Sequence, residues 1–159
     1  MSPGPERRRL ALVAAHGNLD QAYPALILAT TAASMGWEAG IYFTFHGLDI
    51  IHRKRQKHLR VASVGNPAGP IRVPTLLGAL PGGTLAATKM MEKWMADARM
   101  PEVEEFVEMA SGLGVRFFAC STTMGVMGVE EEDLIEGCDI AGAAAFLDYA
   151  ADADVQLFT

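Results

Sequence analysis

The chain has 159 residues, of which 50% are hydrophobic and 20% are charged, a composition typical of one globular domain and not of a disordered or fibrous chain. A formal net charge of -6 at pH 7 argues against a nucleic-acid-binding protein, because binding phosphates requires a dense face of Lys and Arg. The sequence has two cysteines, no recognisable leader peptide and no apolar run near the ~20 residues of a membrane span. We therefore expect a cytoplasmic protein with neither a disulfide framework nor a membrane helix.

Strand-like and helix-like segments alternate along the sequence. We expect a disordered tail over residues 1–8 and a single domain over 9–159. Within it, apolar spacing and Gly, Pro and N-cap signals predict, in chain order, a strand at 10–15, a helix at 19–35, a strand at 37–45, helices at 84–98 and 101–112, strands at 115–119 and 138–140, a helix at 142–151 and a strand at 155–158. Short helices or turns are expected at 47–51 and 121–127. This alternation indicates a three-layer α/β/α domain with a mainly parallel sheet of about five strands.

The first strand, helix and strand form a βαβ unit, whose two strands are parallel and joined by a right-handed crossover. His16-Gly17 follows the first strand and His46-Gly47 the second. Both histidines are therefore expected at the carboxyl edge of the sheet, where ligands bind. Each is either a hydrogen-bonded rim residue or a catalytic base or ligand, and the sequence leaves these interpretations open. The four histidines and two cysteines lack zinc-type spacing, and neither a metal nor a cofactor is predicted.

Three further segments carry distinctive signals. The basic run at 52–60 either contacts an acidic partner or an anionic ligand, or is a solvated helix end or loop. Residues 61–83 are rich in Gly and Pro and form a lid, a binding loop or a partner contact, or else a mobile linker. The helix at 84–98 carries Met90, Met91, Trp94 and Met95 on one stripe, which packs in the core or forms an oligomer or docking interface.

The run at 114–125 is the stretch that the rest of the chain is organised around. Its apolar strand delivers Cys120 to the point where Ser121, Thr122 and Thr123 begin a short helix. Unpaired N–H groups at a helix start and the positive end of its dipole favour a thiolate over a thiol, and the hydroxyls supply further hydrogen bonds. Such a thiolate can accept, hold and pass on a sulfur atom as a persulfide. The alternative is that Cys120 is a packed, unreactive side chain.

Other chemistries have little support. The sequence has no Gly-x-Ser-x-Gly elbow, no Gly-x-Gly-x-x-Gly after the first strand and no Gly-x-x-x-x-Gly-Lys-Ser/Thr loop, so hydrolase, dinucleotide-binding and NTPase functions lose their main signals. A thiol peroxidase would need Arg116 near the thiolate, but four strand residues at ~3.3 Å each separate it from Cys120. The acidic run at 130–133 is interpreted as a solvated helix start. Cys138 belongs to no Cys-x-x-Cys motif and is a candidate second thiol only.

Four segments together resemble the DsrE/DsrF-like family, closest to its DsrE2 and DsrE3 type: residues 17–29 (GNLDQAYPALILA), 43–48 (FTFHGL), 65–67 (GNP) and 119–128 (ACSTTMGVMG). The similarity runs from about Leu10 to the C-terminus. The resemblance implies a cytoplasmic sulfur-trafficking protein with a parallel α/β/α fold, usually a homo-oligomer. In this family a cysteine accepts persulfide sulfur and exchanges it with TusA-like carriers or rhodanese-type sulfurtransferases. Cys120 matches the family's cysteine position, whereas Cys138 matches no general family motif.

Two functions of different classes follow. In the first, the protein is a sulfur carrier or sulfurtransferase that holds sulfane sulfur on Cys120, with Asn18, His46, Thr122 and Thr123 as candidate neighbours. Family members differ in whether they transfer sulfur or only carry it, so the resemblance does not decide whether this chain is an enzyme. In the second, the protein is a non-catalytic binding or regulatory subunit of a sulfur-metabolism complex. The reactivity of the thiol distinguishes the two, because a functional thiolate reacts well below the free-cysteine pKa.

Overall fold

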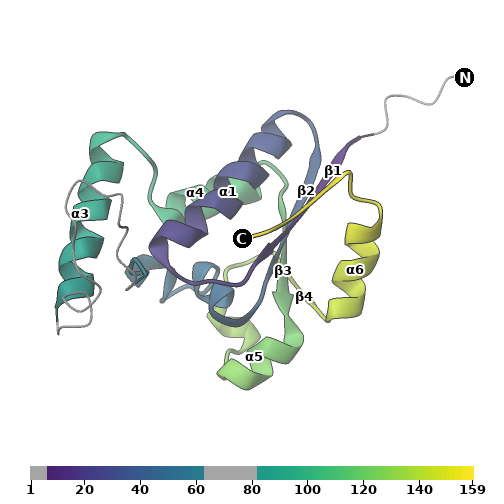
Figure 1. Ribbon diagram of the computed structural model, residues 1–159. Coiled ribbons are helices and arrows are strands. Elements are labelled where there is room, and N and C mark those ends of the chain that lie inside the picture. Colours follow the sequence, from purple (N-terminus) through teal and green to yellow (C-terminus); the bar gives the residue numbers. More distant parts are fainter. Residues whose placement is uncertain (1–6, 63–81) are drawn as a thin grey trace, which may run out of the picture.

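A computed structural model describes residues 7–62 and 82–159 of the chain. Within these residues, β1 (Arg9–Ala14), β2 (Glu38–Phe43), β3 (Arg116–Cys120), β4 (Cys138–Ala141) and β5 (Val155–Phe158) form one parallel sheet in the order β4-β3-β2-β1-β5. Helices α1 (Leu19–Ser34) and α4 (Val103–Gly112) lie on one face of the sheet and α6 (Ala143–Ala151) on the other (Figure 1). The predicted three-layer α/β/α fold with a parallel sheet is therefore confirmed.

The remaining elements are α3 (Gly83–Asp97), α5 (Ser121–Met127) and the 3-10 helices η1 (Phe45–Ile50), η2 (Gln56–His58) and η3 (Glu131–Asp133). Three of them, η1, α3 and α5, lie where the sequence predicts a helix or a turn. The other two, η2 and η3, lie in the basic run at 52–60 and the acidic run at 130–133. The expected disordered tail falls mostly outside the described residues, as does most of the Gly/Pro-rich segment at 61–83.

The sheet face toward α1 and α4 carries the larger core. Leu12, Ile41 and Phe117 come from three adjacent strands and are fully buried, together with Leu26 of α1. Inner strands of a parallel sheet are covered on both faces, which explains why they appear in the sequence as nearly continuous apolar runs. Burying each of these side chains contributes about 1.5–3 kcal/mol, so this core holds the central strands in register.

The face toward α6 holds a smaller core, made largely of aromatic rings. Tyr42 of β2 stacks on Phe146 of α6, with ring centroids 4.7 Å apart. Phe118 of β3 contacts Phe146 and Tyr149 at centroid distances of 5.6 and 5.0 Å. Tyr149 also lies directly on Gly40, where a Cβ atom would collide with its ring. These contacts fix α6 over β2 and β3.

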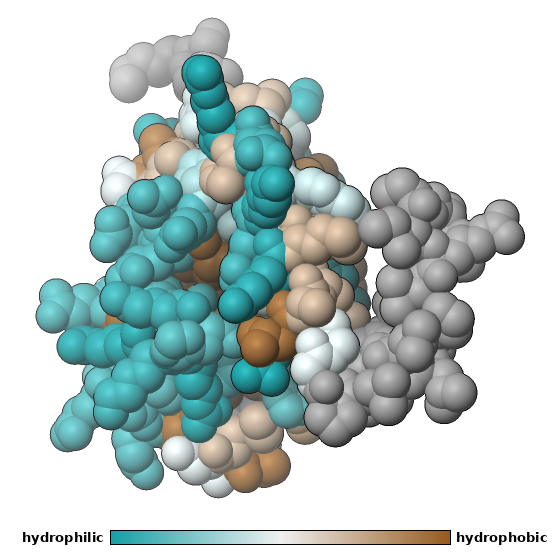
Figure 2. All heavy atoms as spheres, turned by 90° about the vertical axis from the view of Figure 1, so that its left-hand side faces the viewer, coloured by the Kyte–Doolittle hydropathy of each residue, from teal (hydrophilic) through white to brown (hydrophobic). Residues whose placement is uncertain are grey.

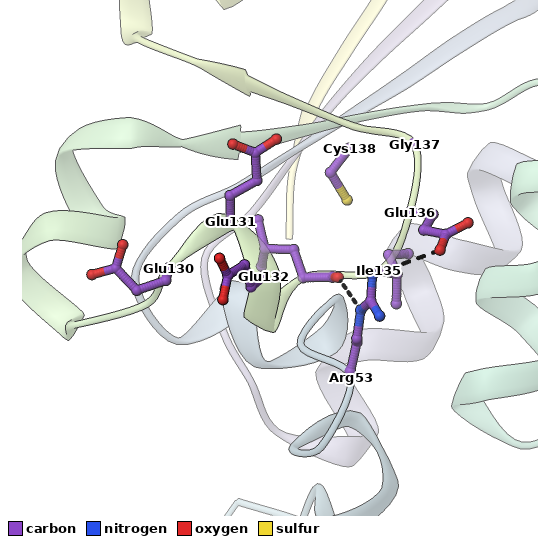
Figure 3. Close-up of a pocket in the computed structure, with 9 residues that line it drawn as sticks. Arg53, Glu130, Glu131, Glu132, Ile135, Glu136, Gly137 and Cys138 are labelled. Atoms are coloured by element: carbon purple, nitrogen blue, oxygen red, sulfur yellow. Dashed lines mark hydrogen bonds and ion pairs between the residues drawn. The ribbon is translucent and has the colours of Figure 1, made fainter.

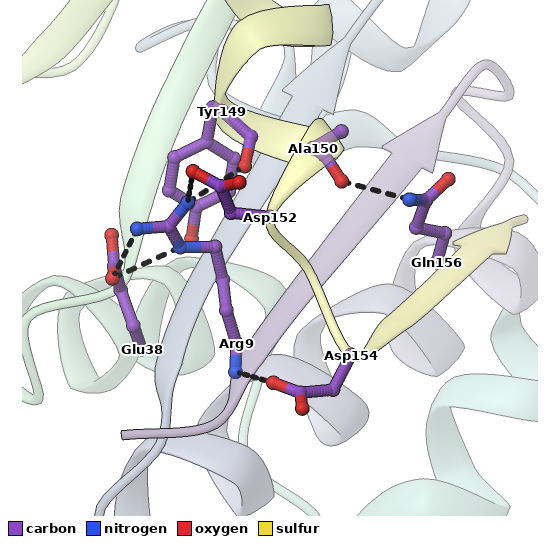
Figure 4. A network of polar contacts seen from close by, with 7 residues as sticks. All are labelled: Arg9, Glu38, Tyr149, Ala150, Asp152, Asp154 and Gln156. Carbon is purple, nitrogen blue, oxygen red and sulfur yellow. Dashed lines mark hydrogen bonds and ion pairs between the residues drawn. The ribbon is translucent and has the colours of Figure 1, made fainter. Parts of the chain in front are cut away.

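Arg9 ties the end of α6 to the sheet (Figure 4). Its guanidinium lies 3.0 Å from the Glu38 carboxylate, donates to the Tyr149 carbonyl oxygen at 3.0 Å and sits 4.8 Å from the centre of the Tyr149 ring. Its backbone N–H donates to Asp154 at 2.7 Å. The last carbonyls of a helix have no partner within the helix, so a cation at this end both satisfies one of them and complements the dipole. The network lies at the amino end of β1, away from Cys120, and its role is structural.

Helix α3 lies at the periphery, away from the sheet (Figure 1), and Thr88 is its one buried residue. Met91 and Met95 pack against the core on the α1 side, whereas Trp94 is exposed, so two methionines of the predicted stripe belong to the core. Seen from the side of α3, the molecule is mainly hydrophilic, with small hydrophobic patches (Figure 2).

Over residues 7–62 and 82–159, every helix is too short or too polar to cross a membrane.

The two His-Gly pairs of the sequence meet at the carboxyl edge of β1 and β2. A Cβ at Gly47 would collide with the carbonyl oxygen of Ala14, and one at Gly17 with the carbonyl oxygen of His46. The Thr44 N–H donates to that same Ala14 oxygen at 3.0 Å. The two segments thus contact each other through their backbones, and only glycine allows the approach.

Replacing Gly47 by Ala is expected to lower the free energy of unfolding by about 1–3 kcal/mol, because the added methyl group forces η1 away from β1. Urea denaturation followed by circular dichroism measures the loss. Gly112→Ala is the matched control, since a Cβ at this helical position meets nothing within 4 Å, and it should be neutral or stabilise by up to about 1 kcal/mol. Equal losses in the two variants would contradict the proposed close contact.

Candidate functional site

Cys120 is the last residue of β3 and the N-cap of α5, as its position between an apolar run and three hydroxyl residues predicts. Its side chain belongs to the core under α6, because residues two apart on a strand share a face and Phe118 points the same way. The residue is 6% exposed. Cys120 therefore lies at the carboxyl edge of the sheet, just beneath the surface.

Two threonine hydroxyls form a chain that ends on the sulfur. The Thr123 Oγ1 donates to Cys120 Sγ at 3.1 Å, and the Thr44 Oγ1 lies 2.9 Å from the Thr123 Oγ1. Because Thr123 gives its proton to the sulfur, Thr44 is the donor in the second bond. Thr123 comes from α5 and Thr44 from the residue after β2, so the chain joins two elements around the thiol.

Burial alone would raise the pKa of the Cys120 thiol, because a charged sulfur loses hydration inside the protein. The Thr123 hydroxyl, then the Tyr42 hydroxyl, the Thr123 backbone and the Thr44 hydroxyl, which acts through Thr123, lower the pKa and outweigh burial. The pKa of Cys120 consequently lies below the ordinary value for cysteine. Burial, followed by the interaction with Cys120, raises the pKa of Tyr42, which stays a hydrogen-bond donor at neutral pH.

Of the neighbours predicted from sequence, the structure brings Thr123 to the sulfur. Thr122 is exposed on α5. Asn18 and His46 instead line a separate cavity on the α1 side, and the His46 side chain is 71% exposed and 4.0 Å from Asp49. Sequence reasoning missed Tyr42 and Thr44. Their alternation along β2 places both on one face, but only the pairing of β2 with β3 puts that face beside Cys120.

The second thiol, Cys138, lies on the other face of the sheet. It begins β4 and pairs with Phe117, whereas Cys120 pairs with Ala141. Three strand residues and one strand spacing put the two Cα atoms about 11 Å apart, and a disulfide requires less than about 7 Å. The structure thus does not bring the two cysteines together.

The Cys138 sulfur points into a cavity of about 690 Å³ (Figure 3). Arg53 also lines this cavity, together with four glutamates and two apolar side chains. These are Glu130, Glu131, Glu132 and Glu136, and Leu134 and Ile135. Burial, with a smaller contribution from Asp139, raises the pKa of Cys138 to about 12. At neutral pH it is a thiol and a poor nucleophile, in contrast to Cys120.

Arg116, the residue that a thiol peroxidase would require, does not reach the thiol. It stacks on the Phe118 ring at 4.6 Å and pairs with Asp139 at 2.8 Å, both toward the amino end of β3. Across the described residues, no group of three or more His, Cys, Asp or Glu side chains is arranged to hold a metal ion. The chemistry that the site offers is that of a single thiolate among hydroxyl groups.

Comparison with known sequences gives one family model and two relatives. The model described as the DsrE/DsrF/DrsH-like family matches residues 6–158. "Sulfur carrier protein DsrE2" of Allochromatium vinosum is 36% identical over 159 residues, covering 96% of this chain and 99% of the relative. "Uncharacterized protein YrkE" of Bacillus subtilis is 28% identical over 156 residues, covering 96% and 98%.

Two solved structures share the fold at low sequence identity. The ychN protein of E. coli superposes with a TM-score of 0.61 at 12% identity, covering 96% of this chain and 99% of that one. Protein MTH1491 of Methanobacterium thermoautotrophicum, whose function is unknown, superposes with a TM-score of 0.54 at 14% identity and the same coverage. Both likenesses concern the arrangement of strands and helices alone.

Thr123→Val should raise the pKa of Cys120, because it removes the hydroxyl that donates to the thiolate while keeping the shape of the side chain. The rate of alkylation by iodoacetamide, measured from pH 5 to 10 with Cys138 replaced by Ser, should rise at higher pH than in the parent and be several times slower at pH 7. Thr123→Ser keeps the hydroxyl and should follow the parent profile. Superimposable profiles for the Val and Ser variants would rule out a role for this hydrogen bond.

Proposed function

Because the chain belongs to the DsrE/DsrF/DrsH-like family, we propose that it is a sulfur carrier or sulfurtransferase that accepts sulfane sulfur as a persulfide on Cys120 and passes it to an acceptor thiol. The observation that carries this proposal is the hydrogen bonding of Cys120, which lowers the pKa of a thiol that burial alone would make unreactive. The relative from Allochromatium vinosum, similar over almost its whole length, bears the name of a sulfur carrier.

The transfer needs no oxidant or cofactor. The Cys120 thiolate attacks the outer sulfur of a donor persulfide, a new S–S bond forms, and the donor's S–S bond breaks with its electron pair leaving on the donor thiolate. In the second step an acceptor thiolate attacks the outer sulfur now held on Cys120, and Cys120 leaves as the thiolate. The number of S–S bonds and the total charge are the same before and after each step.

The hydroxyl groups support both steps. Thr123 donates to the sulfur and Thr44 donates to Thr123, while the Tyr42 hydroxyl also lowers the pKa of the thiol. Together they stabilise Cys120 as the attacking thiolate and again as the leaving group. A thiolate of lowered pKa is also the better leaving group in thiol–disulfide exchange. The same donors can stabilise the negative terminal sulfur of the bound persulfide.

TusA-like carriers and rhodanese-type sulfurtransferases are the donors and acceptors that we propose, since both present sulfur on a cysteine. The cytoplasm suits the exchange, because its reducing conditions keep thiols free, and neither Cys120 nor Cys138 is in a disulfide.

A non-catalytic role is the second candidate. Its support is the burial of Cys120, of which 6% is exposed, since a donor sulfur must reach a side chain lying under the surface. In a binding or regulatory subunit the thiol would remain unmodified, so persulfide loading separates the two functions.

We also propose that the protein is a homo-oligomer. Within residues 7–62 and 82–159, one short helix covers the α6 face of the sheet and β5 is an edge strand, which leaves apolar side chains exposed there. Leu147 of α6 is 64% exposed, and Phe158, on the α6 side of β5, is 70% exposed. Exposed apolar groups gathered on one side of a small protein are typical of an interface.

Incubation with a low-molecular-weight persulfide or polysulfide should add the mass of one sulfur atom at Cys120, located by mass spectrometry of unreduced peptides. Cys120→Ser should abolish this addition, and Cys138→Ser should load as the wild type does, because Cys138 stays protonated at neutral pH. Equal loading of the Cys120→Ser variant would disprove the assignment. An unloaded wild type whose thiol also resists alkylation would favour the binding or regulatory function.

Phe158→Asp combined with Leu147→Asp should reduce the mass of the protein in solution toward that of one chain, measured by light scattering after gel filtration. The charged groups would be buried without partners in an interface at this place. Met109→Asp serves as the control, since Met109 is equally apolar and 45% exposed but lies on α4. A wild type that is monomeric at every concentration would refute the oligomer.

A further inference from the structure

The basic run at 52–60 is not explained by the thiol site. Six of its residues from 53 onward are basic, and three of these form ion pairs: Arg53 with Glu136 at 3.9 Å, Arg55 with Asp49 at 2.9 Å and Lys57 with Glu104 at 2.9 Å. The other three are Lys54, His58 and Arg60. Within residues 7–62 and 82–159 they have no carboxylate within ion-pair distance, although the chain carries a net charge of -6.

These three side chains line one cavity of about 640 Å³. Gly17 and Asn18, which follow β1, form its other side. Four of the six basic residues, Arg55 included, thus line one cavity, and among them are all three that have no ion pair. This coincidence distinguishes the cavity from an ordinary solvated basic loop.

The one carboxylate in the cavity wall is already engaged. Asp49 accepts from Arg55 Nη1 at 2.9 Å and lies 4.0 Å from His46 Nδ1, so it orients Arg55 and does not neutralise Lys54 or Arg60. The segment at 63–81 contains no Asp or Glu and therefore brings no negative charge of its own. Like charges held near one another raise the free energy, and a bound anion relieves that repulsion.

The wall of the cavity is held in place by backbone contacts. The Leu19 N–H at the start of α1 donates to the Arg60 carbonyl at 2.9 Å, which anchors one end of the basic run. The close approach of Gly17 to His46 anchors the segment facing it. A preformed cavity loses less conformational entropy on binding than a mobile loop does.

We propose that this cavity binds a small molecule bearing a compact, doubly charged oxyanion group of the phosphate or sulfate class. Lys54 and Arg60 supply the charges, and Arg55, oriented by Asp49, supplies a planar set of donors suited to such oxygens. The volume lies within the ~300–1,000 Å³ of small-molecule sites and exceeds what one inorganic ion fills, so there is room for the molecule that carries the group. The site does not include Cys120, and its occupancy is independent of the proposed sulfur transfer.

Titration of the isotope-labelled protein with inorganic phosphate, sulfate and glucose 6-phosphate, followed by NMR at constant ionic strength with chloride as reference, tests the proposal. The dianions should shift the amide signals of Gly17, Asn18 and Arg60, and chloride should not. Lys54→Gln with Arg60→Gln should weaken binding at least about tenfold. Lys57→Gln is the matched control, from the same run but paired with Glu104 and outside the cavity, and should bind within about twofold of the wild type.

Equal affinity for phosphate and its sugar ester would identify the free ion as the ligand, whereas tighter binding of the ester would identify the larger molecule; both support the site. Dianion shifts no larger than those of chloride would overturn the proposal, as would equal weakening by Lys57→Gln, which indicates diffuse attraction. Binding of an acidic polypeptide alone, with no small dianion bound, would show that the ligand class is wrong.

Lys54 is exposed, so Lys54→Gln alone gives a folded variant should the double variant not fold. Sulfur loading on Cys120 should be unchanged in all of them.

Discussion

The parallel pairing of β2 with β3 is the constraint on which the thiol site depends. Phe43 lies opposite Ala119 in this pair, so the next residues, Thr44 and Cys120, emerge side by side at the carboxyl edge. Residues two apart on a strand share a face, which places Tyr42 on the same side as the sulfur. Shifting the register by one residue would turn either Tyr42 and Thr44 or Cys120 to the opposite face. The hydroxyls would then be separated from the thiol. The buried α1-side core, with Ile41 and Phe117, excludes such a shift.

The two cysteines of the chain show how much the hydroxyl groups matter. Both are shielded from water, which disfavours a thiolate in each case. Around Cys120 the hydroxyls outweigh that effect and the pKa falls, whereas Cys138 faces an additional negative charge on Asp139 and its pKa rises to about 12. A hydrogen bond to a charged group contributes about 1.5–3 kcal/mol, enough to reverse a moderate loss of hydration. Hydrogen bonding, more than exposure, therefore accounts for the opposite pKa shifts of the two cysteines.

Much of the fold could be predicted from the sequence, because the three central strands are short apolar runs and Gly, Pro and N-cap residues mark the ends of the helices. Cys120 and Thr123 could be predicted too, since they are three residues apart across one strand-to-helix junction. Tyr42 and Thr44 could not, because their relation to Cys120 depends on which strands are neighbours and in what register. The sequence predicts His46 as a neighbour of the thiol because it follows β2, but the chain turns there into η1. The His46 side chain consequently faces the cavity on the α1 side.

The carboxyl edge of the sheet thus carries two different environments, and the His-Gly pairs explain how they stay separate. The contacts of Gly47 with Ala14 and of Gly17 with His46 bring the backbones after β1 and β2 together, which leaves no room for a side chain between them. On the α1 side of this junction the basic side chains surround a cavity, and on the α6 side hydroxyl and aromatic groups surround a sulfur. A cation within ~4–6 Å of Cys120 would itself lower the pKa of the thiol. Because no such cation lies beside it in the described part of the chain, the lowered pKa of Cys120 depends on neutral hydroxyl donors, whose strength changes little with salt or with the charge of a partner.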